Sequence, residues 1–180
     1  TKQKEIYDIV AAANNHVIEI SRPGITYTDV HLSMARIMAQ GLKDLNILKG
    51  DVDEIVANGA QALMMPHGLG HNMGMDVHDM EDLGENYVGY DDTYKRSTQF
   101  GLGSLRMGKM LEKGHVITDE PGIYFIPALI EQWKREGTNA QFINFDVLEK
   151  YYDFGGIRLE DDILITEGGC RLLGSKRLPI

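Results

Sequence analysis

The segment from Pro66 to Asp79 constrains what this chain can form more than any other part of its sequence. It places His67, His71 and His78 within twelve positions and interleaves them with glycines. Glycine lets the backbone approach a ligand closely and take φ values that other residues avoid. Imidazoles can ligate a metal ion or act on a substrate at neutral pH. We therefore expect a loop that carries a reactive site, and the alternative is a glycine-rich loop with surface histidines.

Length, charge and cysteine content exclude several classes of protein. A chain of 180 residues is long enough to form one domain with a buried core and no disulfides. Its net charge of −9 at pH 7 argues against a nucleic-acid partner, and no apolar run reaches the length of a membrane span. The polar residues 1–5 lack the apolar segment of a signal peptide, and the single cysteine, Cys170, fits a reducing compartment. A cytoplasmic location without a membrane partner is therefore expected.

Five segments of the sequence are expected to be helical. In the first two, apolar residues recur three or four positions apart, which is the pattern of an amphipathic helix. Pro23 and Gly24 are expected to end the first helix, and Thr28 is a candidate cap for the second. The expected helices cover residues 2–21, 29–45, 51–58, 127–136 and 145–152.

The strands are expected in the second half of the chain, after a long ordered loop over residues 80–108. One strand covers residues 115–119. A terminal hairpin is expected to pair residues 156–166 with residues 170–173, because a Glu-Gly-Gly turn separates these two segments. The sequence therefore predicts a mixed fold in which helices precede most of the strands.

Two glutamates are expected to meet the histidine-rich loop. Alternate residues of a strand point to opposite faces, so Glu120 shares a face with Thr118. In the later strand Arg158, Glu160 and Asp162 share a face. One histidine with two carboxylates is a normal ligand set for Mn, Fe, Co or Zn. Each glutamate also has a simpler interpretation, as a charged strand end for Glu120 and as a solvated acidic turn for Glu160.

Other catalytic motifs are absent from the sequence. It has no HExxH pair of a helix-borne zinc peptidase, no GxSxG elbow of a serine hydrolase and no GxxxxGK[ST] phosphate-binding loop. Metal-dependent chemistry at the histidine-rich loop is therefore the leading hypothesis.

Three motifs follow one another along the chain. They are His67-Gly-Leu-Gly-His71 with His78-Asp79, then Glu120-Pro-Gly-Ile-Tyr124, then Gly156-Ile-Arg158-Leu-Glu160-Asp161. Together they resemble the pita-bread metallopeptidases, in the branch of the Xaa-Pro dipeptidases (prolidases) and aminopeptidases P. The resemblance spans nearly the whole chain and implies an α/β (α+β) pita-bread fold, with one catalytic domain over residues 1–180.

The resemblance also implies a dinuclear metal centre, usually with Mn²⁺, that has two Asp, one His and two Glu ligands. By motif, the metal ligands in this chain are His71, Glu120 and Glu160. His67 and His78 become catalytic groups that bind the substrate, and Glu120 also passes a proton to the leaving amine. The metal ions activate water for attack on the peptide carbonyl.

A cation for the carboxylate of the substrate is implied as well. Arg158 shares a face with Glu160, so it is expected either to orient that carboxylate or to bind the substrate. Related dipeptidases often place an arginine after the Glu-Pro-Gly-Ile-Tyr motif, where this chain has Lys134 and Arg135. Neither of these two residues is assigned to the substrate.

The two Asp ligands of the family, and its N-terminal domain, have no counterpart in residues 1–180. The chain is therefore expected to be a C-terminal fragment, truncated at the N-terminal part of the fold, that binds one metal ion or none and is inactive alone. The complete protein is expected to be a homodimer that hydrolyses Xaa-Pro dipeptides with two Mn²⁺ ions. Longer Xaa-Pro peptides, the substrates of aminopeptidase P, are the enzymatic alternative. A non-catalytic protein-binding module is the alternative of another class.

Overall fold

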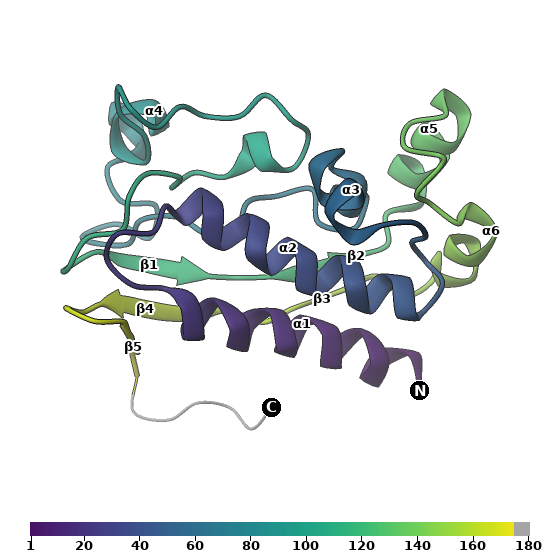
Figure 1. The fold of residues 1–180 in the computed structure, drawn as a ribbon, viewed down its shortest axis with the longest axis horizontal. Coiled ribbons are helices and arrows are strands. Elements are labelled where there is room, and N and C mark those ends of the chain that lie inside the picture. Colours follow the sequence, from purple (N-terminus) through teal and green to yellow (C-terminus); the bar gives the residue numbers. More distant parts are fainter. Residues whose placement is uncertain (175–180) are drawn as a thin grey trace.

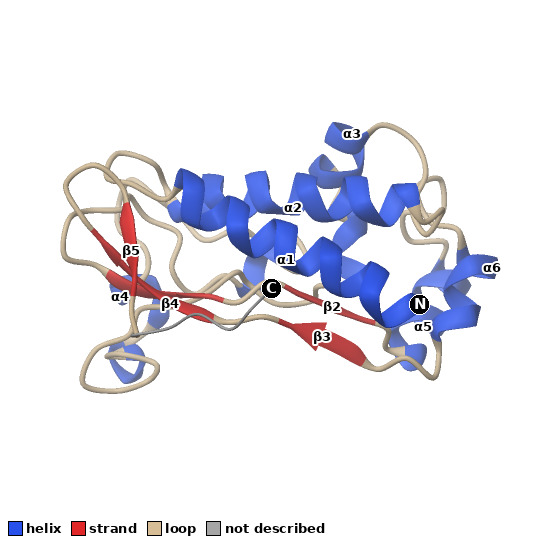
Figure 2. Ribbon diagram, turned by 90° about the horizontal axis from the view of Figure 1, so that it is seen from below, coloured by secondary structure: helices blue, strands red, loops and turns tan. Residues whose placement is uncertain are grey.

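The computed structural model describes residues 1–174 and shows a layer of helices packed on a layer of strands (Figure 1). The helical layer is an antiparallel pair, α1 (Lys2–Ile20) and α2 (Tyr27–Asp44), which lies along one side of the strands (Figure 2). The shorter helices are α3 (Val52–Ala57), α4 (Glu85–Val88), α5 (Pro127–Glu136) and α6 (Phe145–Leu148).

The first two helices lie where the sequence predicts them, but the predicted cap of α2 is wrong. Thr26, not Thr28, precedes the helix, and its hydroxyl accepts a hydrogen bond from the Asp29 N–H at 3.0 Å. This bond satisfies one of the amides that a helix leaves unpaired at its start. Thr28 lies inside the first turn, where its hydroxyl donates to the Gly108 carbonyl oxygen at 3.0 Å.

The strands form a three-stranded antiparallel sheet in the order β1-β4-β5 and a separate antiparallel pair, β2-β3. Asp119 pairs with Asp161 in the first sheet, and Gly122 pairs with Arg158 in the second. One register therefore continues through both sheets, and residues 120 and 160 face each other across the gap. The bounds are β1 (Val116–Asp119), β2 (Gly122–Tyr124), β3 (Gly156–Arg158), β4 (Asp161–Ile165) and β5 (Cys170–Leu172).

The expected single strand over residues 156–166 is wrong, because the structure divides it into β3 and β4. Pro121 lies opposite the break, and proline has no N–H with which to continue the ladder. The Leu159 N–H donates to the Pro121 carbonyl oxygen at 3.2 Å, but the return bond cannot form. The interruption falls at the two predicted glutamate ligands, whose positions therefore lie outside regular strands.

The expected loop over residues 80–108 is partly wrong, since it contains α4 and the 3₁₀ turns Glu81–Leu83 and Leu102–Ser104. A 3₁₀ turn, Glu149–Tyr151, also replaces the second half of the last expected helix. Across the described residues, none of the helices combines the length and apolar character needed to cross a membrane.

The hydrophobic core lies between the helical layer and the strands, and it fixes the strand that carries the site. Tyr27 of α2 is fully buried, and its hydroxyl donates to the Thr118 carbonyl oxygen of β1 at 2.6 Å. Asn14 of α1 is also fully buried and donates to the neighbouring Asp119 carboxylate at 2.9 Å. Both long helices are thus tied to β1 immediately before Glu120.

Candidate active site

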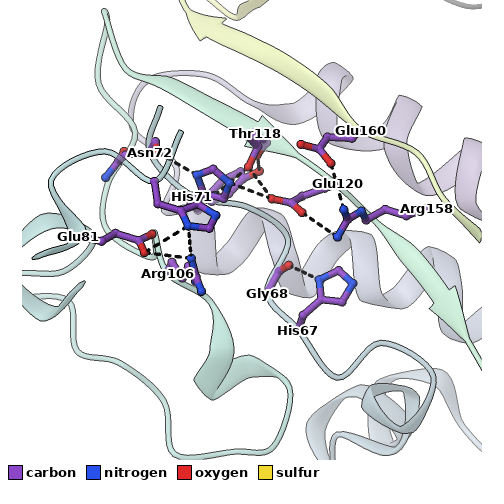
Figure 3. A network of polar contacts seen from close by, with 12 residues as sticks. His67, Gly68, His71, Asn72, Glu81, Arg106, Thr118, Glu120, Arg158 and Glu160 are labelled. Atoms are coloured by element: carbon purple, nitrogen blue, oxygen red, sulfur yellow. Dashed lines mark hydrogen bonds and ion pairs between the residues drawn. The ribbon is translucent and has the colours of Figure 1, made fainter. Parts of the chain in front are cut away.

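Five of the six predicted site residues line one cavity of about 250 Å³ between the histidine-rich loop and the strands (Figure 3). Glu160, the sixth, lies beside the cavity, in contact with Arg158. Ser104 and Arg106 also line the cavity, although the sequence did not single them out. The full lining is His67, Gly68, Gly70, His71, His78, Ser104, Arg106, Glu120 and Arg158.

Residues 69–73 run beside β1 like an additional strand and so bring His71 to the strand layer. The Thr118 N–H donates to the His71 carbonyl oxygen at 3.0 Å, and the Glu120 N–H donates to the Leu69 carbonyl oxygen at 2.9 Å. The approach requires glycine at position 70, where a Cβ atom would lie 2.0 Å from the Thr118 carbonyl oxygen. The histidine segment is therefore held by backbone on its buried side.

The glycines of this segment act differently from the expectation. Gly68 and Gly70 are not among the described residues with positive φ. Their missing side chains make room for the protein's own backbone, since a Cβ at Gly68 would lie 2.3 Å from the Leu105 Cα atom. Gly68 and Gly70 therefore allow close packing within the chain, and both also line the cavity.

His71 and Glu120 meet at the floor of the cavity. The His71 Nδ1–H donates to the Asn72 carbonyl oxygen at 2.9 Å, which leaves Nε2 as the ring atom that can bind a metal ion through its lone pair. That nitrogen lies 3.3 Å from Glu120 Oε1. The Thr118 hydroxyl links the two residues, because it accepts from the His71 N–H at 3.0 Å and donates to Glu120 Oε1 at 2.8 Å. Two electron-rich atoms held this close together favour a cation between them.

The pair fits a divalent metal ion. Protein nitrogen and oxygen ligands lie about 2.1 Å from zinc, so two ligands of one tetrahedral centre lie about 3.4 Å apart. The observed 3.3 Å between His71 Nε2 and Glu120 Oε1 agrees with this spacing. Metal-ligating histidines also donate their other ring N–H to a neighbouring acceptor, as His71 does. Within residues 1–174, however, no three His, Cys, Asp or Glu side chains are grouped to hold an ion, so Glu160 does not complete the set.

Arg158 separates the two predicted glutamate ligands. Its guanidinium nitrogens lie 3.4 Å from Glu120 Oε2 and 3.5 Å from Glu160 Oε2 (Figure 3). Like charges that face each other across a strand pair are destabilising, and the arginine compensates for them here. Because the Arg158 and Glu160 side chains are 46% and 44% exposed, their contact is worth only about 0–1 kcal/mol. A metal ion could therefore displace Arg158 from Glu160 at small cost.

His67 lies in the wall of the cavity as a neutral imidazole. Its Nδ1–H donates to the Gly68 carbonyl oxygen at 2.7 Å, and burial lowers its pKa. Its Nε2 atom is buried and has no hydrogen-bond partner among the described residues. Nearby His31 of α2 is buried too, and burial, followed by the effect of His67, lowers the pKa of His31 to about 4. The wall therefore holds a buried ring nitrogen whose hydrogen-bonding capacity is not used by the described residues.

His78 lies on the opposite, more exposed wall, where its ring meets the His71 ring edge-on with the centroids 4.3 Å apart. Arg106 Nη1 lies 2.9 Å from His78 Nδ1 and 3.0 Å from Glu81 Oε2. The Asp79 carboxylate accepts from the Asp76 N–H at 3.4 Å, a contact within the histidine-rich loop.

Arg106 is not predictable from local sequence, because it lies 28 residues beyond its partner His78 in a segment without clear periodicity. The cation expected from the resemblance lies instead after the Glu-Pro-Gly-Ile-Tyr motif. There Lys134 pairs with Glu149, and the hydrogen bond from Lys134 to Glu149 raises the lysine pKa. The one sequence signal for Arg106 is the Leu102–Ser104 turn shortly before it, since Ser104 and Arg106 both line the cavity.

Comparisons with known proteins identify the family of the chain. The profile of metallopeptidase family M24 matches residues 1–167. A probable Xaa-Pro aminopeptidase of Sclerotinia sclerotiorum is 41% identical over 168 residues, which are 93% of this chain and 29% of that protein. The Xaa-Pro dipeptidase of Homo sapiens is 39% identical over 171 residues, which are 95% of this chain and 33% of that protein. The chain thus spans about one third of the length of these relatives.

Solved structures show the same relationship. An aspartate-to-alanine variant of Escherichia coli aminopeptidase P superimposes with a TM-score of 0.66 at 36% identity, over 94% of this chain and 30% of that chain. Proline aminopeptidase P II from Yersinia pestis gives a TM-score of 0.65 at 35% identity, over 94% of this chain and 31% of that chain. The expected pita-bread fold, in part, is therefore confirmed, and the chain belongs to metallopeptidase family M24.

Proposed function

We propose that this chain supplies most of the active site of a metal-dependent Xaa-Pro dipeptidase. The observation that carries the proposal is the pairing of His71 with Glu120 at the floor of a cavity whose walls bear His67, His78 and two arginines. By their names, the relatives above act on Xaa-Pro substrates. Family M24 itself is a family of metallopeptidases.

His71, Glu120 and Glu160 are the residues that we assign to the metal ions. Divalent cations bound there would acidify water and stabilise negative charge on the scissile carbonyl oxygen. A ligand set rich in carboxylates suits Mn²⁺. Glu160 joins the set when its exposed contact with Arg158 gives way. We assign the two remaining Asp ligands to another part of a longer polypeptide, since the relatives are about three times as long as this chain.

Three side chains then act on the peptide itself. Glu120 takes a proton from the attacking water and delivers it to the leaving amine. His67 lines the cavity, and burial lowers its pKa, so we assign it to substrate binding as a neutral imidazole. His78 donates a hydrogen bond to the carbonyl oxygen as negative charge develops there. Arg158 keeps the two glutamates from repelling each other until the metal ions bind.

The lining of the cavity suits a substrate with a free carboxylate. Arg106 and Arg158 both line it, and guanidinium groups bind carboxylates through paired hydrogen bonds. Aminopeptidase P activity on longer peptides is the second candidate, because several relatives carry that name.

The first test measures hydrolysis of Ala-Pro, Ala-Pro amide and Ala-Pro-Ala by the complete protein, with and without Mn²⁺. We expect Mn²⁺-dependent cleavage of Ala-Pro, with slower cleavage of the amide and the tripeptide. Faster cleavage of Ala-Pro-Ala would identify an aminopeptidase P instead. Loss of all cleavage although Mn²⁺ binds would overturn the Xaa-Pro assignment, and failure to bind metal would leave a protein-binding module.

A second test uses the 180-residue chain alone. We expect calorimetry to show weak binding of one Mn²⁺ ion or none, and we expect no hydrolysis of Ala-Pro. Tight binding of two ions would refute the assignment of two ligands to another part of the polypeptide. For the complete protein we propose a cytoplasmic homodimer, which cell fractionation and size-exclusion chromatography would test.

A further inference from the structure

The contact between Arg106 and His78 determines where the imidazole carries its proton. Arg106 Nη1 lies 2.9 Å from His78 Nδ1, which is hydrogen-bond distance. A guanidinium has only donors, so the His78 nitrogen must accept. We propose that Arg106 is a positioning residue that makes Nδ1 the acceptor atom of the His78 ring and so leaves Nε2 as its donor atom. The benefit to catalysis rests on the proposed function, whereas the position of the proton does not.

The Glu81 carboxylate could favour the opposite tautomer of His78, but it lies too far from the ring. Glu81 Oε2 lies 3.9 Å from His78 Nδ1 and 3.0 Å from Arg106 Nη1. Only the shorter of these contacts is a hydrogen bond. A proton on His78 Nδ1 would also face the Arg106 N–H directly. The geometry therefore assigns the Glu81 carboxylate to Arg106.

A row of alternating charges holds Arg106 in this position. Glu81 contacts one side of the guanidinium, and Glu85 Oε1 lies 3.9 Å from Arg106 Nε. Glu85 is in turn held by Arg96 at 2.6 Å, and Arg96 Nε donates to the Gly103 carbonyl oxygen at 2.7 Å. The Glu81 side chain is only 16% exposed, so its charge is less screened than that of a surface pair.

The ring of His78 is oriented by a second contact. It meets the His71 ring at 88° with the centroids 4.3 Å apart, which restricts rotation of either ring. With Nδ1 directed at Arg106, His78 can offer an Nε2–H donor to an oxygen atom in the cavity. The other tautomer would bring a lone pair against the lone pairs of the peptide carbonyl. Arg106 thus selects the form of His78 that stabilises negative charge.

Nitrogen-15 NMR of the histidine-labelled 180-residue chain at pH 8 tests the proposal without any peptide. We expect His78 to show a protonated Nε2 and an unprotonated Nδ1 in the wild type. Arg106→Met should give a mixture of tautomers, and Arg106→Lys, which still donates, should restore the original form. Arg22→Met, a distant arginine on an exposed turn, is the matched control and should change nothing. A proton on Nδ1 in the wild type, or the same tautomer in Arg106→Met, would refute the proposal.

Kinetics of the complete protein separate positioning from substrate binding. If Arg106 positions His78, Arg106→Met should lower kcat for Ala-Pro and Ala-Pro amide alike, by about 10–100-fold as for other outer-shell partners. If Arg106 only binds the substrate carboxylate, the substitution should raise KM for Ala-Pro and leave the hydrolysis of Ala-Pro amide unchanged. That result would show that the positioning role is wrong. Absence of any hydrolysis by the wild type would overturn the proposed function but not the NMR result.

Discussion

The floor of the cavity, which we call the strand wall, and its exposed side, which we call the loop wall, hold their functional groups by different means. On the strand wall, His71 and Glu120 are buried, and backbone hydrogen bonds with the Thr118 hydroxyl fix them. On the loop wall, the His78 and Arg106 side chains are 50% and 38% exposed, and ion pairs hold them. Buried hydrogen bonds do not weaken with salt, whereas exposed ion pairs do. The strand wall therefore provides a rigid floor, and the loop wall provides adjustable contacts.

This contrast predicts the largest effect at Glu120. Glu120→Gln keeps the shape of the side chain but removes its charge and its capacity to take a proton. We expect kcat for Ala-Pro in the complete protein to fall by about 10²–10⁴-fold, the range of general acid–base catalysis. Steady-state kinetics with Glu112→Gln, on an exposed turn, as control would measure this. A loss smaller than tenfold would place the proton transfer elsewhere.

The buried side should also control the pH dependence of stability, through His31. The pKa of His31 in the folded chain is about 4, below the ordinary value of 6.5. At pH values between 4 and 6.5 the unfolded chain therefore binds a proton at His31 that the folded chain does not. The free energy of unfolding should fall by about 3 kcal/mol as the pH decreases from 6.5 to 4, and this loss should level off below pH 4.

Urea titrations across this range would compare the wild type with His31→Leu. The variant should lose this part of the pH dependence, while His16→Leu, at a half-buried histidine, should retain it. Parallel curves for the wild type and His31→Leu would show that His31 does not carry the effect.

Thr118 should give an intermediate effect, because its hydroxyl joins His71 to Glu120. Thr118→Val keeps the shape and removes both hydrogen bonds, and Thr118→Ser keeps them. We expect the valine variant to bind Mn²⁺ about 10–100-fold more weakly in the complete protein, as for other outer-shell contacts. Calorimetry would measure the affinity, with exposed Thr93→Val as control. Equal weakening in the serine and valine variants would mean that packing, not the hydroxyl, matters.

The smallest effect is expected on the loop wall. Arg96→Gln removes the 2.6 Å contact with Glu85. The Arg96 and Glu85 side chains are 32% and 26% exposed. The free energy of unfolding should fall by at most about 1 kcal/mol, and 1 M salt should remove most of the difference. Lys95→Gln, at the neighbouring and more exposed pair with Asp92, should change it still less. A loss that persists in 1 M salt would show that both walls are held alike.

The parts that the sequence predicted are those governed by local pattern. Apolar spacing located α1 and α2, and the density of histidines located the cavity. The break between β3 and β4 was not predicted, because it depends on Pro121, which lies opposite the break on another segment. The role of Arg106 was not predicted for the same reason, since it depends on a contact with His78, 28 residues earlier in the chain. Single-segment patterns carry no information about such pairings.

The close approach at Gly70 has a consequence for how this cavity can evolve. No side chain fits between that residue and the Thr118 carbonyl oxygen, and Gly68 is enclosed in the same way by Leu105. Both positions should therefore tolerate no substitution in a saturation library, whatever substrate is selected. Variation that alters substrate range must accumulate on the loop wall, where the His78 and Arg106 side chains are partly exposed. Selection for new substrates would then act on one half of the cavity while the other half stays invariant.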